Sequence, residues 1–179
     1  MRLFIAIEIP EEVKDYIAEV QRKINTDENK IRFVKKEQMH LTLKFLGEVQ
    51  PNITEEIKNN LKKITFKPFS VVLDNLGVFP SESYIRVIWI GLKPEALIVE
   101  LQKDIDEKFK QLFKKEKNFK THITLARVKF IENKKQFIEK LKNIKIENRK
   151  IDVNNFKLVK STLTQKGPVY NDLEVYSSS

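Results

Sequence analysis

Apolar and polar positions alternate along the start of the chain. From Leu3 to Ile9 every second residue is leucine or isoleucine, which is typical of a strand with one face in the core. Pro10 ends this strand and suits the first turn of a helix. From Val13 to Ile24 apolar residues recur at helical spacing, so the pattern predicts an amphipathic helix directly after the strand.

The remaining patterns predict further strands and helices in alternation. Residues 25–30 are polar and loop-like, and Thr54 is expected to cap a helix. Residues 78–83 are expected to form the long loop of a hairpin. The other expected strands cover residues 31–34, 66–76, 84–92, 146–163 and 169–176, and the other expected helices follow residues 93–94 and cover about residues 133–144.

Two short apolar segments, residues 39–46 and 121–128, contain the only two histidines of the chain. Both segments have the composition of a buried strand. His40 is followed two positions later by Thr42, and His122 is followed two positions later by Thr124. Because side chains alternate between the faces of a strand, each histidine and its threonine share one face, and apolar side chains occupy the other.

These residue types suit acid–base chemistry on an anion. Histidine is the side chain whose unperturbed pKa lets it give or take a proton near neutral pH, and a threonine hydroxyl can donate a hydrogen bond to an anionic oxygen. A lone histidine in a strand is more often a core residue bonded to the backbone. Two histidines that carry threonines in the same register favour a paired functional site instead.

The two halves of the chain repeat. The histidines are 122 − 40 = 82 residues apart, and each motif is followed by a loop, a helix and a pair of strands. A period of this length is too long for a solenoid. The sequence therefore predicts a duplicated α+β unit with pseudo-two-fold symmetry, without indicating the order of its strands.

The paired motifs resemble the two H-x-T-hydrophobic motifs of the two-histidine phosphoesterase superfamily, in particular those of the family called 2′-5′ RNA ligase or RNA 2′,3′-cyclic phosphodiesterase. The resemblance extends over nearly the whole chain. Thr121 departs from the family pattern, which usually has proline before the second histidine, but this change removes no catalytic group. The segments that carry the resemblance are residues 1–7, 40–48, 86–91, 122–127 and 167–170.

The resemblance implies a bilobal α+β fold, with two antiparallel sheets facing across a central groove and helices on the outside. Residues 1–176 would form one bilobal catalytic domain of two intertwined lobes, each with one H-x-T motif, and residues 177–179 a frayed tail. The resemblance also implies hydrolysis of a cyclic phosphate to a 2′-phosphate, with His40 as proton donor and His122 as proton acceptor. The motifs themselves are too similar to distinguish the two roles.

Two such motifs fit the chemistry of a cyclic phosphodiester. Its opening needs a water and a leaving oxygen nearly in line across phosphorus, while negative charge builds on the non-bridging oxygens. One histidine would act as base and the other as acid, each typically worth about 10²- to 10⁴-fold in rate. Thr42 and Thr124 are expected to bind the phosphate oxygens between the two imidazoles.

Four further residues are candidate substrate contacts. Strict alternation places Lys44 on the histidine face, where it would meet RNA backbone. The same alternation sends Arg127, which matches an arginine of the family, to the opposite face unless a bulge redirects it. Phe4 would stack on a base if its face lines a cleft, and otherwise makes a core contact. Arg86 would bind either a phosphate or a structural carboxylate.

The composition adds positive charge to this picture. The chain has 34 Lys and Arg against 25 Asp and Glu, giving a net charge of +9 and a pI near 9.5, which fits a polyanionic partner such as RNA. Most of these basic residues are lysines, however, and many lysines with few glycines and no cysteine also fit a heat-adapted protein. Charge alone therefore does not establish RNA binding.

Several classes of protein do not fit the sequence. The absence of cysteine excludes disulfides, thiolate nucleophiles and cysteine-type zinc sites. No apolar run approaches the roughly 18 residues of a membrane span, so we expect a cytoplasmic protein that does not bind membranes, and a monomer. With both histidines used in acid–base work, no H-E-x-x-H pattern and no G-x-x-x-x-G-K-[ST] loop, we expect no metal, no ATP and no other cofactor.

The first hypothesis is a metal-independent phosphodiesterase that acts on RNA with a 2′,3′-cyclic phosphate end or on a nucleoside cyclic phosphate. Reversal of the same ester chemistry would join 2′-5′ linkages without ATP. Two alternatives stay open: an enzyme for small cyclic phosphates or 2′-5′ oligonucleotides, and an RNA-binding module with little or no turnover. A pure binder would show salt-dependent RNA binding without hydrolysis.

Overall fold

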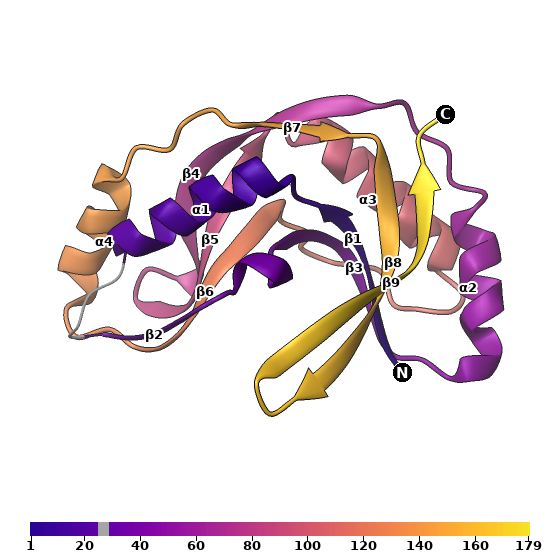
Figure 1. Cartoon of the computed structure of the whole chain (residues 1–179), viewed down its shortest axis with the longest axis horizontal. Coiled ribbons are helices and arrows are strands. Elements are labelled where there is room, and N and C mark those ends of the chain that lie inside the picture. Colours follow the sequence, from indigo (N-terminus) through magenta and orange to yellow (C-terminus); the bar gives the residue numbers. More distant parts are fainter. Residues whose placement is uncertain (25–28) are drawn as a thin grey trace.

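The computed structural model describes residues 1–24 and 29–179, which form strands and helices (Figure 1). The strands are β1 (Arg2–Glu8), β2 (Lys30–Phe33), β3 (His40–Glu48), β4 (Phe69–Ser81), β5 (Tyr84–Lys93), β6 (His122–Phe130), β7 (Lys150–Val153), β8 (Asn155–Thr164) and β9 (Gly167–Ser177). The helices are α1 (Glu11–Ile24), α2 (Thr54–Leu61), α3 (Ala96–Phe109) and α4 (Lys134–Asn143), with 3₁₀ turns η1 (Lys36–Gln38) and η2 (Pro51–Ile53) before β3 and α2.

The strands form two antiparallel sheets. Sheet A has the strand order β3-β1-β8-β9, and sheet B has the order β2-β6-β5-β4-β7. At the junction between the sheets, β3 of sheet A is in contact with β6 of sheet B. In Figure 1, α1 and α4 lie at one end of the molecule, and α2 and α3 lie at the other. The predicted α+β architecture with two antiparallel sheets and a duplicated unit is confirmed.

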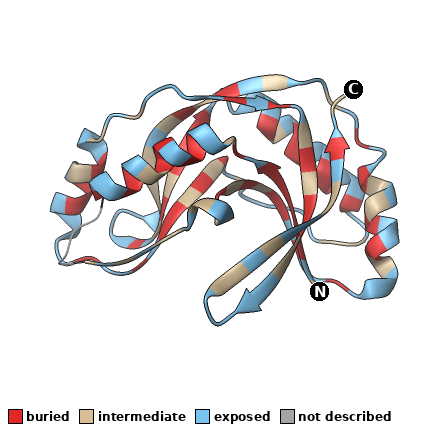
Figure 2. Cartoon of the chain, viewed as in Figure 1, coloured by how far each residue is buried: buried red, intermediate tan, exposed pale blue. Residues whose placement is uncertain are grey.

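The two halves of the chain are intertwined. Helix α1 follows β1 of sheet A but packs against β6 of sheet B, while α3 follows β5 of sheet B and packs against β3 of sheet A. The buried side chains form a cluster that includes residues of both sheets and of all four helices. Figure 2 shows these buried residues along the sides of the helices that face the sheets. The histidine-bearing strands are therefore fixed to each other by a shared core.

The duplication is clearest in β3 and β6. Each strand has nine residues and begins at its histidine. In both, the first and third residues are partly exposed, while the second, fourth, fifth and seventh are buried and the others are exposed. Two adjacent buried positions in the middle of a strand break the alternation of faces, which indicates a β-bulge.

The bulge in β3 follows the first motif. Thr42 is opposite Ala6 of β1, but Lys44 is opposite Ile5, so Leu43 has no partner position of its own. Because one extra residue is inserted, the side chains after it are reversed relative to strict alternation. Lys44 therefore turns to the core side of the sheet, and the residue after it turns to the histidine face.

The bulge in β6 follows the second motif at the same place. Thr124 is opposite Trp89 of β5, but Ala126 is opposite Ile88, so Leu125 is the inserted residue. The same reversal follows, and it places the next residue of β6 on the face that carries the histidine. The two bulges are thus a shared feature of the duplicated unit.

Two expected elements differ from the structure. β4 continues to Ser81 and turns through Glu82 and Ser83 into β5, so the expected long loop is a two-residue turn. Polar residues are tolerated in this exposed part of the strand, and for that reason the polar pattern suggested a loop. The expected strand over residues 146–163 is instead two strands in different sheets, β7 and β8. Of the expected loop at residues 25–30, residues 25–28 lie outside the described part.

Two further expectations concern the end of the chain and the start of a helix. At the end of the chain, Ser178 N–H donates to Asn154 O at 2.7 Å and Ser179 N–H donates to Phe66 O at 2.9 Å, and the frayed tail at residues 177–179 stays a prediction. Thr54 does not cap α2, since this helix continues directly from η2 and its cap position is one residue earlier. The Thr54 hydroxyl is buried and has no partner within the described residues.

Candidate active site

The two motifs start neighbouring strands. β3 and β6 are in contact although they belong to different sheets, and each begins with its histidine. Burial lowers the pKa of His40, and the charges of Lys14 and then of His122 act in the same direction. Thr42 and Thr124 are partly exposed and lie on the faces of their histidines. The fold thus brings together the four residues that the sequence singled out.

Both imidazoles are oriented by the backbone in the same way. His40 Nδ1 lies 2.7 Å from the carbonyl oxygen of Gln38, and His122 Nδ1 lies 2.6 Å from the carbonyl oxygen of Lys120. A carbonyl oxygen can only accept, so Nδ1 carries the hydrogen in each ring. In the neutral ring the lone pair is then on Nε2, the atom that can accept a proton or, once protonated, donate one.

Aromatic rings enclose His40. Its ring centroid lies 4.8 Å from that of Phe4 and 5.2 Å from that of Tyr170 on β9. A small pocket of about 60 Å³ opens beside it, lined in part by Lys14 of α1. Burial lowers the pKa of His40 to about 4, against the hydrogen bond to Gln38 and with help from the charge of Lys14. His40 is therefore neutral at pH 7 when no substrate is bound.

His122 has a similar but more open environment. Its ring lies 5.0 Å from Phe79 and 6.3 Å from Trp89. Burial lowers the pKa of His122, and the nearby charges of Arg127 and then Lys120 act in the same direction. The indole ring of Trp89 lies against the backbone of Gly77, its partner on β4. Only glycine leaves room for the ring, because a Cβ at Gly77 would be 2.2 Å from it.

Arg127 lies on the histidine face. The bulge in β6 reverses the alternation, so the exposed Arg127 is on the same side as His122 and Thr124. Its charge acts on His122, and it also opposes the burial that raises the pKa of Tyr170. Of the two alternatives left open by the sequence, redirection by a bulge is the one that the structure has.

Phe45 is a residue that the sequence analysis missed. It occupies the position in β3 that Arg127 occupies in β6, and it is 65% exposed. Its ring centroid lies 6.1 Å from that of Phe4, which in turn contacts His40. A large apolar side chain left exposed beside a candidate site offers a surface for a flat apolar group such as a base. Strict alternation along β3 predicts this apolar residue on the core face of the strand, opposite the histidine.

The prediction for Lys44 was wrong. The bulge turns this residue away from the histidine face and into the core, where it is 2% exposed. Its Nζ lies 2.5 Å from Asp106 Oδ1 of α3. An ammonium group is buried only when it is paired, and the partner comes from a distant part of the chain. Lys44 therefore cannot contact RNA.

Phe4 and Arg86 both make contacts within the protein. Phe4 is 3% exposed and packs beneath His40, so it makes the core contact and has no free face for a base. Among the described residues Arg86 has no carboxylate partner: it is exposed, and its Nη1 donates to the carbonyl oxygens of Lys129 at 3.0 Å and Val128 at 3.4 Å, while a phosphate contact stays a prediction. Its guanidinium also lies 4.4 Å from the centre of the Tyr84 ring. Both residues support the sheets.

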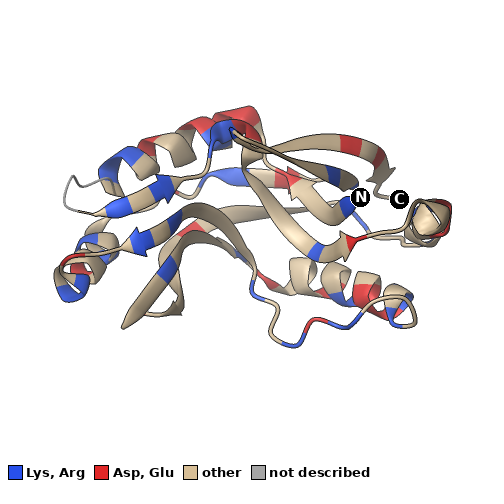
Figure 3. Ribbon diagram, turned by 90° about the horizontal axis from the view of Figure 1, so that it is seen from below, with Lys and Arg blue, Asp and Glu red and all other residues tan. Residues whose placement is uncertain are grey.

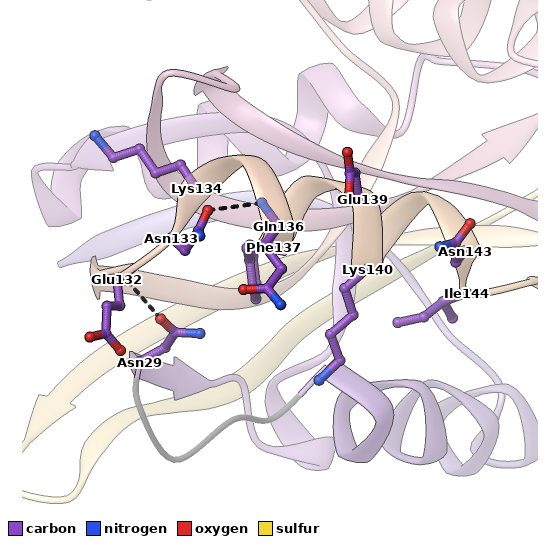
Figure 4. Close-up of a pocket in the computed structure, with 10 residues that line it drawn as sticks. All are labelled: Asn29, Glu132, Asn133, Lys134, Gln136, Phe137, Glu139, Lys140, Asn143 and Ile144. Atoms are coloured by element: carbon purple, nitrogen blue, oxygen red, sulfur yellow. Dashed lines mark hydrogen bonds between the residues drawn. The ribbon is translucent and has the colours of Figure 1, made fainter.

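A pocket of about 1240 Å³ lies away from the histidines, along α4 (Figure 4). Its polar atoms bind the backbone: Asn133 Oδ1 accepts from Gln136 N–H at 3.1 Å, and Asn29 Oδ1 accepts from Glu132 N–H at 2.9 Å. These bonds cap a helix and join a strand end, and none of the paired site residues lines the pocket. The candidate site is therefore the histidine pair.

Charge and metal ligands add little to the choice of site. Figure 3 shows Lys and Arg on many elements and interspersed with Asp and Glu along the helices. Within residues 1–24 and 29–179, no group of three or more His, Cys, Asp or Glu side chains is arranged to hold a metal ion. Across those same residues, no helix is long and apolar enough to cross a membrane.

Comparison with known proteins identifies the family. The model of the LigT-like phosphoesterase family matches the chain twice, over residues 7–89 and 90–170. An RNA 2′,3′-cyclic phosphodiesterase of Methanocaldococcus jannaschii is 44% identical over 172 residues, which are 95% of this chain and 96% of that protein. A protein of the same name from Archaeoglobus fulgidus is 33% identical over 178 residues, covering 98% and 99% of the two chains.

Solved structures agree with this result. A crystal structure of a Thermus thermophilus protein superposes with a TM-score of 0.84 at 31% identity, covering 99% of this chain and 97% of the other. The crystal structure of E. coli LigT complexed with 3′-AMP has a TM-score of 0.81 at 25% identity, covering 99% and 98%. The two matched segments of the family model are the two halves that each contribute one histidine. This chain belongs to the LigT-like phosphoesterase family.

Proposed function

We propose that this protein is an RNA 2′,3′-cyclic phosphodiesterase that opens the cyclic phosphate to a 2′-phosphate by metal-independent acid–base catalysis. The observation that carries the proposal is the pair of imidazoles on adjacent strands, each with Nδ1 bonded to a backbone carbonyl and Nε2 left for substrate. The names of the curated relatives support the same activity, and their similarity extends over 95% and 98% of the chain.

The reaction assigns one proton transfer to each ring. His122 Nε2 accepts a proton from water as the water oxygen forms a bond to phosphorus. The bond from phosphorus to the 3′ oxygen breaks on the opposite side, and that oxygen takes the proton of His40 Nε2. His122 ends protonated and His40 neutral, and exchange with solvent restores both. The hydrogen bond from Nδ1 to a carbonyl keeps each ring in place and stabilises its charged form.

The residues beside the histidines would bind the phosphoryl group. Thr42 and Thr124 each stand two residues from a histidine on the same face, so their hydroxyls can donate to the two non-bridging oxygens. Arg127, brought to this face by the bulge, would add a positive charge where negative charge builds up. Phe45 is positioned to contact the nucleoside.

Binding of the anionic substrate is needed to charge the donor. Burial lowers the pKa of His40 to about 4 in the free protein, so His40 alone is a strong acid but is rarely protonated at neutral pH. A phosphate between the two rings favours their charged forms and raises the pKa of both. The proton on His40 is therefore expected to arrive together with the substrate, and its acidity then favours transfer to the leaving oxygen.

Two substitutions test the proposal. His40→Ala and His122→Ala are each expected to abolish hydrolysis of adenosine 2′,3′-cyclic phosphate and of an RNA with a cyclic phosphate end, while thermal unfolding remains cooperative. Chromatography of the nucleoside monophosphates identifies the 2′-phosphate product, and treatment with EDTA should leave the rate unchanged. Full activity in His122→Ala would refute the mechanism.

RNA binding without turnover is the alternative from another class. It predicts salt-dependent binding of RNA and no hydrolysis in the same buffer. The assignment of RNA rather than a small cyclic nucleotide would be supported by a higher kcat/KM for the RNA end than for the mononucleotide. Joining of a 2′,3′-cyclic end to a 5′-hydroxyl without ATP would extend the proposal to 2′-5′ ligation.

A further inference from the structure

A buried ion pair lies directly behind the first motif. Lys44 is the residue that the bulge in β3 turns into the core, and its Nζ lies 2.5 Å from Asp106 Oδ1. The side chains are only 1% and 8% exposed. Burying two charges carries a large desolvation cost, and well-packed apolar residues of similar volume are often at least as stable. Stability alone is therefore a weak explanation for this pair.

Both members of the pair also bind the segment that leads into the second motif. Lys44 Nζ donates to the carbonyl oxygen of Lys114 at 2.8 Å, and Asp106 Oδ2 accepts from the N–H of Glu116 at 2.8 Å. Burial would raise the pKa of Asp106, but its hydrogen bonds with Lys44 and Glu116 outweigh this and lower it, so the carboxylate is charged. The segment of residues 110–121 is thereby tied to the back of β3.

The same segment orients the second histidine. Four residues after Glu116, the carbonyl oxygen of Lys120 accepts the hydrogen bond from His122 Nδ1 at 2.6 Å. One connection thus runs from β3, which carries His40, through the ion pair to the backbone that holds His122. The connection joins two rings that must stand on opposite sides of one phosphorus atom.

The second bulge shows that the ion pair is not needed to form a bulge. In β6 the position of Lys44 is occupied by Ala126, which is fully buried. At that bulge a neutral side chain binds the backbone of the inserted residue. Gln21 Nε2 donates to the carbonyl oxygens of Leu125 and of Val34, both at 2.9 Å. The charged pair differs from this arrangement because it forms hydrogen bonds with the backbone of residues 110–121.

We propose that Lys44 and Asp106 are positioning residues that fix the relative placement of His40 and His122 by anchoring residues 110–121 to β3. This inference rests on the function proposed above. A misplacement of about 1 Å can cost on the order of 100-fold in rate, so loss of the pair is expected to lower kcat by about 100-fold. KM should change much less, because neither side chain reaches the histidine face.

The test uses a double variant that removes both charges. Lys44→Met with Asp106→Leu leaves no unpaired buried charge, so the protein is expected to fold cooperatively. The single variant Lys44→Arg, in which Asp106 is unchanged, retains both charges. Its kcat is expected to be close to that of wild type and well above that of the double variant. Leu141→Ala, on α4 and remote from the connection, is the matched control: it creates a core cavity and should lower the melting temperature without lowering kcat at 25 °C.

NMR of the imidazoles provides a readout that does not depend on activity. The chain has only two histidines, so a ¹H–¹³C spectrum contains two Hε1 signals, assigned with His40→Gln. The double variant should shift the His122 signal, whereas Leu141→Ala should leave it in place. A folded double variant with wild-type kcat and an unchanged His122 signal would overturn the positioning role while leaving the proposed function intact. If wild type itself hydrolyses no cyclic phosphate, the proposed function fails and the NMR comparison still decides the positioning role.

Discussion

Removal of the Tyr170 ring is expected to raise the pKa of His40. Burial is the main reason that this pKa falls from 6.5 to about 4, and the enclosing rings are Phe4 at 4.8 Å and Tyr170 at 5.2 Å. The full shift corresponds to about 3 kcal/mol in favour of the neutral imidazole. If the two rings contribute equally, Tyr170→Ala should return about half of it, or roughly one pKa unit.

The assay is an NMR titration of the two imidazoles between pH 3 and pH 8. Tyr170→Phe is the matched control because it keeps the ring and removes only the hydroxyl, so the pKa of His40 should stay at its wild-type value. The pKa of His122 should change little in either variant, since its enclosing rings are Phe79 and Trp89. A wild-type His40 that titrates near 6.5, or a Tyr170→Ala variant that titrates like wild type, would refute the reasoning.

The same geometry leads to four more predictions. Because the pKa of both histidines is lowered in the free protein, kcat/KM should peak below pH 6.5 and fall about tenfold per pH unit above it. The folded pKa of His40 lies below its unfolded value, so stability should fall by up to about 3 kcal/mol from pH 6.5 to pH 4, and His40→Gln should remove that loss in urea unfolding. Thr121→Val should raise the free energy of unfolding by about 1 kcal/mol, because the buried Thr121 hydroxyl has no partner within the described residues. Urea unfolding measures this change, and an unchanged midpoint would count against this interpretation. Arg127→Met should lower kcat/KM by about 10- to 100-fold, the value of a charge-assisted hydrogen bond, with unchanged melting temperature, and wild-type kinetics would exclude a phosphate contact.

The sequence was sufficient to predict the histidine pair and the duplicated α+β unit. A buried strand appears in the sequence as a continuous run of apolar residues. Two histidines with threonines in the same register are hard to explain by core packing. The contact of β3 with β6 across the two sheets could not be predicted, because contacts between residues 82 positions apart leave no local pattern. The family resemblance supplied the bilobal arrangement that periodicity could not.

The two bulges explain the errors at the site. Alternation through Leu41 and Leu43 predicts that Phe45 is buried and that Lys44 faces the histidine side, and the structure has the reverse. An inserted apolar residue looks like an ordinary strand residue, so the sequence does not mark it. The counter-charge that permits Lys44 to be buried is on Asp106, 62 residues later, which a local reading does not detect.

The duplicated site is symmetric in its backbone and asymmetric in its chemistry. Both strands present a histidine, a threonine and, after the bulge, an exposed residue on one face, but this last residue is Phe45 in one half and Arg127 in the other. An arginine attracts an anion and an aromatic ring suits a base, so we expect a nucleotide to bind in one preferred direction between the two strands. This direction would in turn decide which ribose oxygen is next to which imidazole. Because the two motifs are otherwise equivalent, we expect this asymmetry, together with the deeper burial of His40, to determine which histidine acts as the acid and which as the base in the proposed reaction.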